Sequence, residues 1–457
     1  MWRPSWTGWN SSAPLISPCR FRAASTAAIA TCLSEGTDMY RSGRSFLLLQ
    51  GPCTAFFRRL AIKLNAQGHR VTALNFNAGD ALFRSGLQQI AFRAPLDELP
   101  GFLKEIWQRH EITDQVMFGD RRAVHRPSIL EARSHGIRNH IFEEGYLRPF
   151  WITHEREGVN GHSLLPRDPD WYRHVAGRLG PLPTAVRFRS SFRVRAVQDV
   201  AYHVAGLYNP LGYRHYRNHA PVTAPVEYLG YIKRFTRLRW QRRHRGDAAC
   251  IERLRRQSAP YYVLPLQLNG DAQVRDHSDF EHMGQVIENV MTSFARHAPQ
   301  EARLVIKNHP LDMGLLDYES QIEMLAKRLE LNDRIEYLEA GNLDRLLAKA
   351  TGLVTVNSTS GLVSLEHGCP TLTLSDPIYA MPGLTHQGDL DSFWQHPQRP
   401  QRDLYQAFRT TLLHTVQVNG GFYCTTGIDL AVANTLSRLT AERSPLETLL
   451  ECQLQTA

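Results

Sequence analysis

Two short motifs in the second half of the chain carry side chains suited to binding an anion. Lys307-Asn308-His309-Pro310 and Asn357-Ser358-Thr359-Ser360-Gly361 each follow an apolar run. Proline ends a strand, so the imidazole before it can face a ligand and donate a hydrogen bond to a phosphate. Hydroxyls and unpaired backbone N–H groups at a helix start also suit an anion. The motifs predict a nucleotide-phosphate site; the alternatives are a structural His-Pro loop and ordinary helix capping.

Carboxylates follow apolar runs at three other positions. Glu143-Glu144-Gly145 and Asp120 lie in the first half, and Asp271 follows the first predicted strand of the second half. Adjacent side chains of an extended chain point in opposite directions, so one glutamate can face a site while the other is anchored elsewhere. Such a carboxylate can act as general acid or base on a sugar hydroxyl. The alternatives are exposed loop glutamates, a helix-capping Asp120 and a turn at Asn-Gly-Asp271.

Motifs for other chemistries are absent from the sequence. The 20 histidines include no HExxH pattern, and there is no GxSxG elbow, P-loop or GxGxxG. Seven scattered cysteines form no CxxC pair, which favours reduced thiols in a cytoplasmic protein and disfavours zinc. We therefore expect neither a metal nor a resident cofactor.

Alternating apolar runs and helical spacing predict the elements that position these groups. Strand 46–50, a glycine turn, helix 56–67 and strand 71–76 form a βαβ unit, followed by strands 115–118 and 140–142 around a helix over 127–134. A second series of alternating strands and helices runs from strand 261–268 to strand 371–374. The sequence thus predicts an α/β fold of two Rossmann-like domains facing across a cleft, with ligands at the carboxyl ends of the strands.

Composition divides the 457 residues into five parts. Residues 1–38 are expected to be an unstructured leader or a mis-assigned start before Met39, because no acid occurs before Glu35 and strand-like sequence begins at Ser45. The other predicted parts are an N-terminal Rossmann-like domain with a helical insert (45–230), a basic interdomain segment (231–258), a C-terminal Rossmann-like domain (259–395) and a helical tail (396–457). Deleting residues 1–38 should leave fold and activity intact.

The net charge of +9 is local, because seven basic residues and no acid lie in 233–245. This segment is either a solvated helix face or a patch for anionic lipid head groups. No recognised nucleic-acid-binding module surrounds it, so we expect no nucleic-acid partner. The sequence contains no run of 18 apolar residues, so we expect any membrane contact to be peripheral.

Several longer motifs occur along the chain: Phe46-Leu-Leu-Leu-Gln-Gly-Pro52, Asn75-Phe-Asn-Ala-Gly-Asp80, Phe142-Glu-Glu-Gly-Tyr-Leu-Arg-Pro149, Val159-Asn-Gly-His-Ser163, Lys307-Asn-His-Pro-Leu-Asp312, Val356-Asn-Ser-Thr-Ser-Gly361 and Pro382-Gly-Leu-Thr-His-Gln-Gly388. The order of these motifs is that of the capsule polysaccharide biosynthesis proteins of the KpsS/LipB type, and the chain resembles that family from about Ser45 to Trp394. The resemblance implies a retaining glycosyltransferase of the two-Rossmann GT-B type. Its members move β-Kdo from CMP-β-Kdo to a (lyso)phosphatidylglycerol acceptor, which starts the poly-Kdo linker of a capsule.

The same resemblance implies a place and partners for this chain. They are the inner face of the cytoplasmic membrane, an anionic phospholipid acceptor, a CMP-sugar donor and other capsule biosynthesis and export proteins. The first domain then binds the acceptor and the second binds the nucleotide sugar. Two alternatives stay open: transfer of another nucleotide-activated sugar, and a noncatalytic scaffold in capsule assembly.

Residue roles follow from the motifs shared with the family. The resemblance implies catalytic roles for Glu143 and Glu144 and phosphate contacts for His309, Ser358 and Thr359, with no metal. Retention through a double displacement requires a carboxylate nucleophile. We expect Asp271 in that role, because it is the acid nearest the predicted hinge, and Asp120 as the reserve candidate.

Overall fold

The computed structural model describes residues 43–217, 246–268 and 278–454, together with Val226, 228–231, 233–234 and 236. From Gly43 onward the chain forms one compact unit. The predicted leader 1–38 and Asp271 lie outside the described residues. Within those ranges, no helix combines the length and apolarity that crossing a bilayer requires.

The N-terminal half is built on a seven-stranded sheet of order β12-β6-β5-β4-β1-β2-β3. Its strands are β1 (Ser45–Leu48), β2 (Arg70–Asn75), β3 (Gln88–Ala91), β4 (Asp114–Phe118), β5 (Arg138–Glu144), β6 (Trp151–Arg156) and β12 (Gln417–Asn419). β1 to β5 pair in parallel, whereas β6 runs antiparallel to both β5 and β12. The four strands and two helices predicted in this half are confirmed, whereas β3, β6 and β12 were not predicted.

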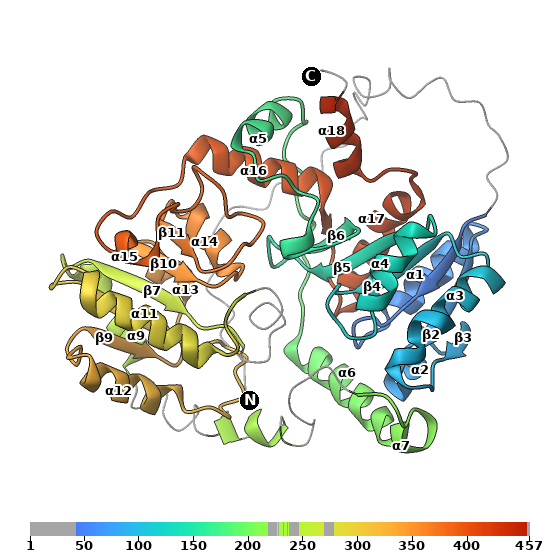
Figure 1. Cartoon of the computed structure of the whole chain (residues 1–457), viewed down its shortest axis with the longest axis horizontal. Coiled ribbons are helices and arrows are strands. Elements are labelled where there is room, and N and C mark those ends of the chain that lie inside the picture. The colour runs from blue at the N-terminus through green and yellow to red at the C-terminus, as the bar shows by residue number, and fades with distance from the viewer. Residues whose placement is uncertain are drawn as a thin grey trace, which may run out of the picture. The chain divides into compact units, whose positions relative to one another are not determined.

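Helices cover both faces of this sheet (Figure 1). On one face Leu48 and Phe142 pack with α1 (Phe56–Ala66) and α17 (Thr425–Thr440). On the other face Leu49 and Ile141 pack with α3 (Leu99–Arg109) and α4 (Arg126–Ser134). Because side chains alternate along a strand, this arrangement decides on which face each acid of β5 lies.

The C-terminal half is built on a five-stranded parallel sheet of order β11-β10-β7-β8-β9. Its strands are β7 (Tyr261–Pro265), β8 (Arg303–Lys307), β9 (Ile335–Leu338), β10 (Gly352–Thr355) and β11 (Thr371–Thr373). Residues of α11 (Met283–His297) and α12 (Tyr318–Arg328) pack in one core cluster with this sheet, and residues of α9 (Asp247–Arg256) and α13 (Leu343–Leu347) in another. The predicted α/β fold with two Rossmann-like halves is confirmed.

The C-terminal segment differs from the predicted helical tail. It contains α16 (Arg402–Thr415), α17 and α18 (Pro445–Leu454), but β12 returns to the N-terminal sheet and pairs with β6. Val418 of β12 is buried there. A three-residue strand is too short to show an alternating pattern, so the sequence offered no signal for it.

One apolar cluster contains residues from both halves. Trp171 and Tyr172 of α5 (Pro169–Ala176) belong to it, together with Phe408 of α16 and with Leu362 and Tyr379 of the second half. Leu362 lies in the short helix α14 (Ser360–Glu366), which follows β10. The cluster therefore brings the loops that end strands in the two halves close together.

Candidate functional site

The acid pair lies at the end of β5, inside the strand. Glu143 and Glu144 pair with Thr153 and Ile152 of β6, which extends the strand beyond the predicted 140–142. The side chains diverge. The hydroxyl of Tyr423 donates to Glu144 Oε1 at 2.6 Å, on the face covered by α1 and α17. Burial and the Glu144 charge raise the pKa of Tyr423 well above its ordinary value, so this hydroxyl stays protonated as a donor.

Glu143 lies on the opposite face of β5. Its Oε1 accepts the backbone N–H of Glu144 at 2.9 Å. Its Oε2 is 3.3 Å from the position that a Cβ at Gly119 would occupy, and Gly119 has φ +72°. Burial raises the pKa of Tyr146 well above its ordinary value, and the nearby Glu155 and Glu143 charges contribute to that shift. Glu143 therefore lies close enough to Tyr146 for its charge to affect the Tyr146 hydroxyl.

Asp120 is buried and holds a neighbouring loop. Its Oδ2 accepts the backbone N–H of Val159 at 3.4 Å and contacts His162 Nδ1 at 3.1 Å. Val159 precedes the short 3-10 helix Asn160–His162, and His162 is its last residue. The carboxylate of Asp120 is thus engaged in positioning this helix.

A second buried acid, Glu155 of β6, supports the same loop. Its Oε1 accepts from the Tyr146 hydroxyl at 2.7 Å, and its Oε2 accepts from Ser163. The Tyr146 oxygen in turn accepts the backbone N–H of Asn160 at 2.8 Å. Burial raises the pKa of Glu155 to about 7. The sequence motifs Val159-Asn-Gly-His-Ser163 and Phe142-Glu-Glu-Gly-Tyr-Leu-Arg-Pro149 were usable signals for this loop and for Tyr146, but nothing local pointed to Glu155.

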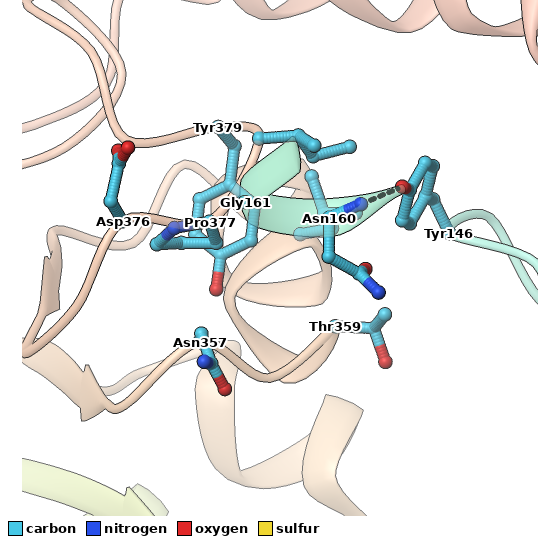
Figure 2. A pocket seen from close by; sticks show the side chains of 10 residues that line it. Tyr146, Asn160, Gly161, Asn357, Thr359, Asp376, Pro377 and Tyr379 are labelled. Carbon is cyan, nitrogen blue, oxygen red and sulfur yellow. Dashed lines mark hydrogen bonds between the residues drawn. The ribbon is translucent and has the colours of Figure 1, made fainter. Parts of the chain in front are cut away.

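A small pocket lies where this loop meets the second half (Figure 2). Its lining consists of Tyr146, Asn160, Gly161, Asn357, Thr359, Leu362, Asp376, Pro377, Ile378 and Tyr379. Figure 2 shows the Asn160 amide directed toward the Thr359 side chain, with Asn357 on the same side of the pocket. Polar groups of one loop from each half therefore converge.

The Asn357–Gly361 loop is held by three contacts with the rest of its half. Asn357 exchanges two hydrogen bonds with the Gln267 side chain, at 3.0 and 3.2 Å. The Tyr379 hydroxyl donates to the Ser358 carbonyl at 2.5 Å, and the Ser358 hydroxyl accepts the backbone N–H of Ser360 at 3.2 Å. A Cβ at Gly361 would lie 2.2 Å from the Tyr379 hydroxyl, so this glycine is required by close packing. Thr359 occupies the N-cap position of α14 without a side-chain capping bond, and it lines the pocket.

Arg234 holds the His309–Pro310 loop. This buried guanidinium forms an ion pair with Glu339 at 2.8 Å and donates to the carbonyls of His309 (3.1 Å), Pro310 (3.4 Å) and Asp312. Although burial opposes ionisation of Glu339, hydrogen bonds from Tyr337 and Asn308 and the Arg234 charge hold its pKa below the ordinary value. Arg234 belongs to the predicted basic patch 233–245, but it is buried and holds this loop through hydrogen bonds. Apart from Lys233 and Thr236, the rest of that segment lies outside the described residues.

His309 and Lys307 have lowered pKa values. Burial, aided by the Lys307, Arg148 and Arg234 charges, lowers the pKa of His309 to about 4. Its Nδ1 accepts the backbone N–H of Leu311 at 3.1 Å, so the neutral ring carries its proton on Nε2. Burial and Arg234 lower the pKa of Lys307 to about 8. The neutral imidazole therefore offers an N–H donor, and Lys307 is mostly charged at neutral pH.

The structure brings some predicted residues together and leaves others apart. Asn357 and Thr359 line the pocket, whereas Lys307, His309 and both glutamates do not. Arg148 of the first half is nevertheless close enough to influence His309. Within the described ranges, no group of three or more His, Cys, Asp or Glu residues is arranged to hold a metal ion. Cys53, Cys250, Cys369 and Cys424, which lie in the described ranges, are free thiols.

Comparison with known proteins gives consistent matches. Residues 113–423 match the family described as capsule polysaccharide biosynthesis protein. The chain is 35% identical to the capsule polysaccharide export protein KpsS of Escherichia coli, with 84% of this chain and 97% of that protein covered. It is 36% identical to the capsule polysaccharide modification protein LipB of Neisseria meningitidis serogroup B, with 84% and 93% covered.

Among solved structures, one match is KpsC, the β-Kdo 2,7 transferase of Thermosulfurimonas dismutans. It has 13% identity and a TM-score of 0.39, and the match covers 90% of this chain and 99% of that one. The matches to KpsS and LipB cover almost the whole length of those proteins, and the family match covers most of this chain. The chain therefore belongs to the capsule polysaccharide biosynthesis protein family.

Proposed function

We propose that this protein is a retaining glycosyltransferase that moves β-Kdo from CMP-β-Kdo to a (lyso)phosphatidylglycerol acceptor and so initiates the poly-Kdo linker of a capsular polysaccharide. The observation that carries the proposal is the convergence of Asn160 with Asn357 and Thr359 in one pocket. In folds of two Rossmann-like halves, ligands bind at the carboxyl ends of the strands. Because the acceptor is a lipid, the protein works at the inner face of the cytoplasmic membrane beside other capsule biosynthesis and export proteins.

The donor phosphate is bound by the second half in this proposal. A CMP-sugar carries a single phosphate, and Lys307 supplies a positive charge because its pKa of about 8 keeps it mostly protonated at pH 7. His309 donates through Nε2–H, the tautomer favoured by its bond from Leu311. The Ser358 and Thr359 hydroxyls add neutral donors. These groups balance the phosphate charge without a metal ion.

The reaction is a double displacement with Asp271 as nucleophile. Its carboxylate attacks the anomeric carbon of Kdo, the bond from that carbon to the phosphate oxygen breaks, and CMP leaves with the electron pair. The acceptor hydroxyl then attacks the same carbon, its proton passes to a general base, and the bond to Asp271 breaks. Two inversions give overall retention.

We assign the general base to Glu143. Glu144 accepts a 2.6 Å hydrogen bond from Tyr423 on the face covered by α1 and α17, whereas Glu143 lies on the opposite face of β5, beside Gly119. Asp120 is buried beneath Val159 and His162, and we therefore give it a supporting role in place of its reserve role as nucleophile.

One assay tests the reaction. The purified protein is incubated with CMP-Kdo generated in situ and a fluorescent phosphatidylglycerol, and the lipid is analysed by mass spectrometry. We expect a mass increase of one Kdo, with at least a hundredfold slower transfer by Glu143→Gln and a smaller effect of Glu144→Gln. Transfer from a UDP-sugar instead of CMP-Kdo would contradict the donor, and no transfer from any nucleotide sugar would indicate a scaffold.

A second assay tests the nucleophile. Asp271→Asn and Asp120→Asn variants are incubated with CMP-Kdo, and the intact proteins are weighed by mass spectrometry. The Asp120→Asn variant should still form the glycosyl adduct. An adduct on the Asp271→Asn variant would refute the assignment of Asp271.

A further inference from the structure

Helix α6 (Phe192–Ala205) turns its polar residues toward the protein. The Tyr202 hydroxyl donates to Asp80 at 3.1 Å and accepts from the Asn77 side chain at 2.7 Å. A Cβ at Gly79 would lie 2.5 Å from the Tyr202 ring, so α6 packs closely on α2 (Ala78–Phe83). Figure 1 shows α6 and α7 (Asn209–Gly212) at the edge of the N-terminal half. The face of α6 that contacts the protein is thus its polar one.

The opposite face of α6 is apolar and continues through the 3-10 turn Gly206–Tyr208 into α7. Its residues are Val197, Val200, Val204, Leu207 and Leu211, with exposed fractions of 69%, 43%, 58%, 78% and 83%. Their spacing of three and four residues places them along one stripe. Helices on protein surfaces normally show the reverse arrangement, with the apolar face inward. A contiguous exposed apolar stripe of this kind indicates an external apolar partner.

Arginines accompany the stripe. The segment 181–217 contains six arginines and one acid, a net charge of +5. Arg193 lies on the same outer face of α6, and Arg187 and Arg189 are exposed in the segment that leads into the helix. Arg195 is engaged elsewhere, with its guanidinium 4.1 Å from the Tyr423 ring centroid. Because the whole chain carries +9 and 233–245 contributes +7, the remainder outside both segments has a net charge of −3.

We propose that α6 and α7 dock the protein onto an anionic lipid bilayer. The valine and leucine side chains enter the boundary between head groups and acyl chains, and the arginines contact the phosphates, as in amphipathic helices that lie in a membrane surface. The charge complementarity favours this partner over an uncharged apolar protein surface. The inference rests on the proposed function in one respect, because a lipid acceptor requires a route to the membrane.

This surface differs from the one predicted from sequence. The prediction placed lipid binding in 233–245, but Arg234 of that segment is buried against Glu339 and cannot reach a head group. The α6–α7 surface adds apolar insertion to charge. Binding should therefore persist in part at high salt, whereas a purely basic patch would release the bilayer.

Vesicle flotation of the full chain tests the proposal without donor sugar. We expect the wild-type protein to float with vesicles of phosphatidylglycerol and phosphatidylcholine, and a Val197→Gln, Val204→Gln, Leu207→Gln variant to bind at least about tenfold more weakly. The matched control is Ile62→Gln, Leu130→Gln, Met324→Gln, which replaces exposed apolar residues on other helices and should bind as the wild type does. An unchanged thermal unfolding temperature shows that both variants are folded.

A second comparison separates this inference from the proposed enzymatic function. Transfer to a short-chain phosphatidylglycerol kept below its micelle concentration should be unchanged in the α6–α7 variant, whereas transfer to the vesicle-embedded lipid should fall by about the loss in binding. Wild-type binding by the variant, or no flotation of the wild type itself, would overturn the docking proposal. Flotation without transfer to either acceptor would refute the enzymatic function and leave the docking surface intact.

Discussion

The two halves hold their site loops with buried side chains of different kinds, an acid in the N-terminal half and an arginine in the C-terminal half. In the N-terminal half, Glu155 supports the Asn160 loop, and its hydrogen-bond partners are the hydroxyls of Tyr146 and Ser163. In the C-terminal half, Arg234 supports the His309 loop and forms an ion pair with Glu339. The buried acid bonded by hydroxyls has its pKa raised to about 7, whereas the acid paired with arginine has its pKa lowered.

This difference predicts different responses to pH. Burial penalises the charged form of an acid unless a cation or several donors compensate it. The Asn160 loop therefore depends on the protonation of Glu155 near neutral pH, whereas the His309 loop keeps its ion pair there. Four substitutions test the comparison, in decreasing order of expected effect.

Replacing Arg234 by methionine should have the largest effect. The change leaves Glu339 buried without its cation and three loop carbonyls without a donor, so we expect a loss of about 3–5 kcal/mol in the free energy of unfolding of the C-terminal half. Urea denaturation measures this loss. Lys233→Met is the control, because Lys233 is an exposed neighbour. Equal stability of the two variants would show that the loop does not depend on the pair.

Replacing Glu155 by glutamine should change the pH dependence of stability. The native pKa of Glu155 is raised from its ordinary 4.5 to about 7, so the native state binds more protons and wild-type stability falls as pH rises through that window. The fall amounts to about 3 kcal/mol. The glutamine variant lacks this fall and should gain relative to wild type at pH 8. Denaturation at pH 5 and pH 8 is the measurement, with the exposed Glu442→Gln as control; parallel profiles for Glu155→Gln and wild type would contradict the raised pKa.

Replacing Thr359 by valine should have a moderate and purely functional effect. Thr359 lines the pocket and its hydroxyl makes no capping bond, so the loss of the hydroxyl should leave stability unchanged and weaken CMP binding by about tenfold, or about 1–1.5 kcal/mol. Calorimetric titration with CMP measures the change. Thr351→Val, which precedes β10, is the matched control. Unaltered CMP affinity of Thr359→Val would remove Thr359 from the donor site.

Replacing Arg167 by glutamine should have the smallest effect. Arg167 pairs with Asp376 at 3.5 Å, but both side chains are partly exposed, so the ion pair contributes at most about 1 kcal/mol. Arg167 also donates to the carbonyl of Ile378 at 2.8 Å, beside the pocket. Thermal unfolding should therefore shift only slightly. A large shift would mean that this contact, more than the shared apolar cluster, joins the halves.

Much of the fold was predictable where the core leaves a local pattern. The runs at 46–50, 115–118 and 303–307 are apolar because both faces of a central parallel strand are covered by helices, and each was predicted. β3 at the sheet edge has no buried residue, and β12 has only three residues. Neither carries a local signal, so both were missed.

The candidate site shows the same division. His309, Asn357 and Thr359 were named as candidates because a strand followed by Pro, Ser, Thr or Gly is a local pattern that places polar groups at a sheet edge. Tyr146, Asn160, Glu155 and Tyr379 were not named as site residues, because their importance comes from contacts with distant parts of the chain. Arg234 was interpreted as a surface charge for the same reason.

The sequence by itself determined that the chain forms two α/β halves and that Glu143 and Glu144 diverge, because adjacent side chains of an extended strand alternate. Only the tertiary structure decided which partner each acid meets. Glu144 and Tyr423 are 279 positions apart, and Arg234 and Glu339 are 105 apart. Pairings over such separations depend on how sheets and helices pack, and no local periodicity encodes them.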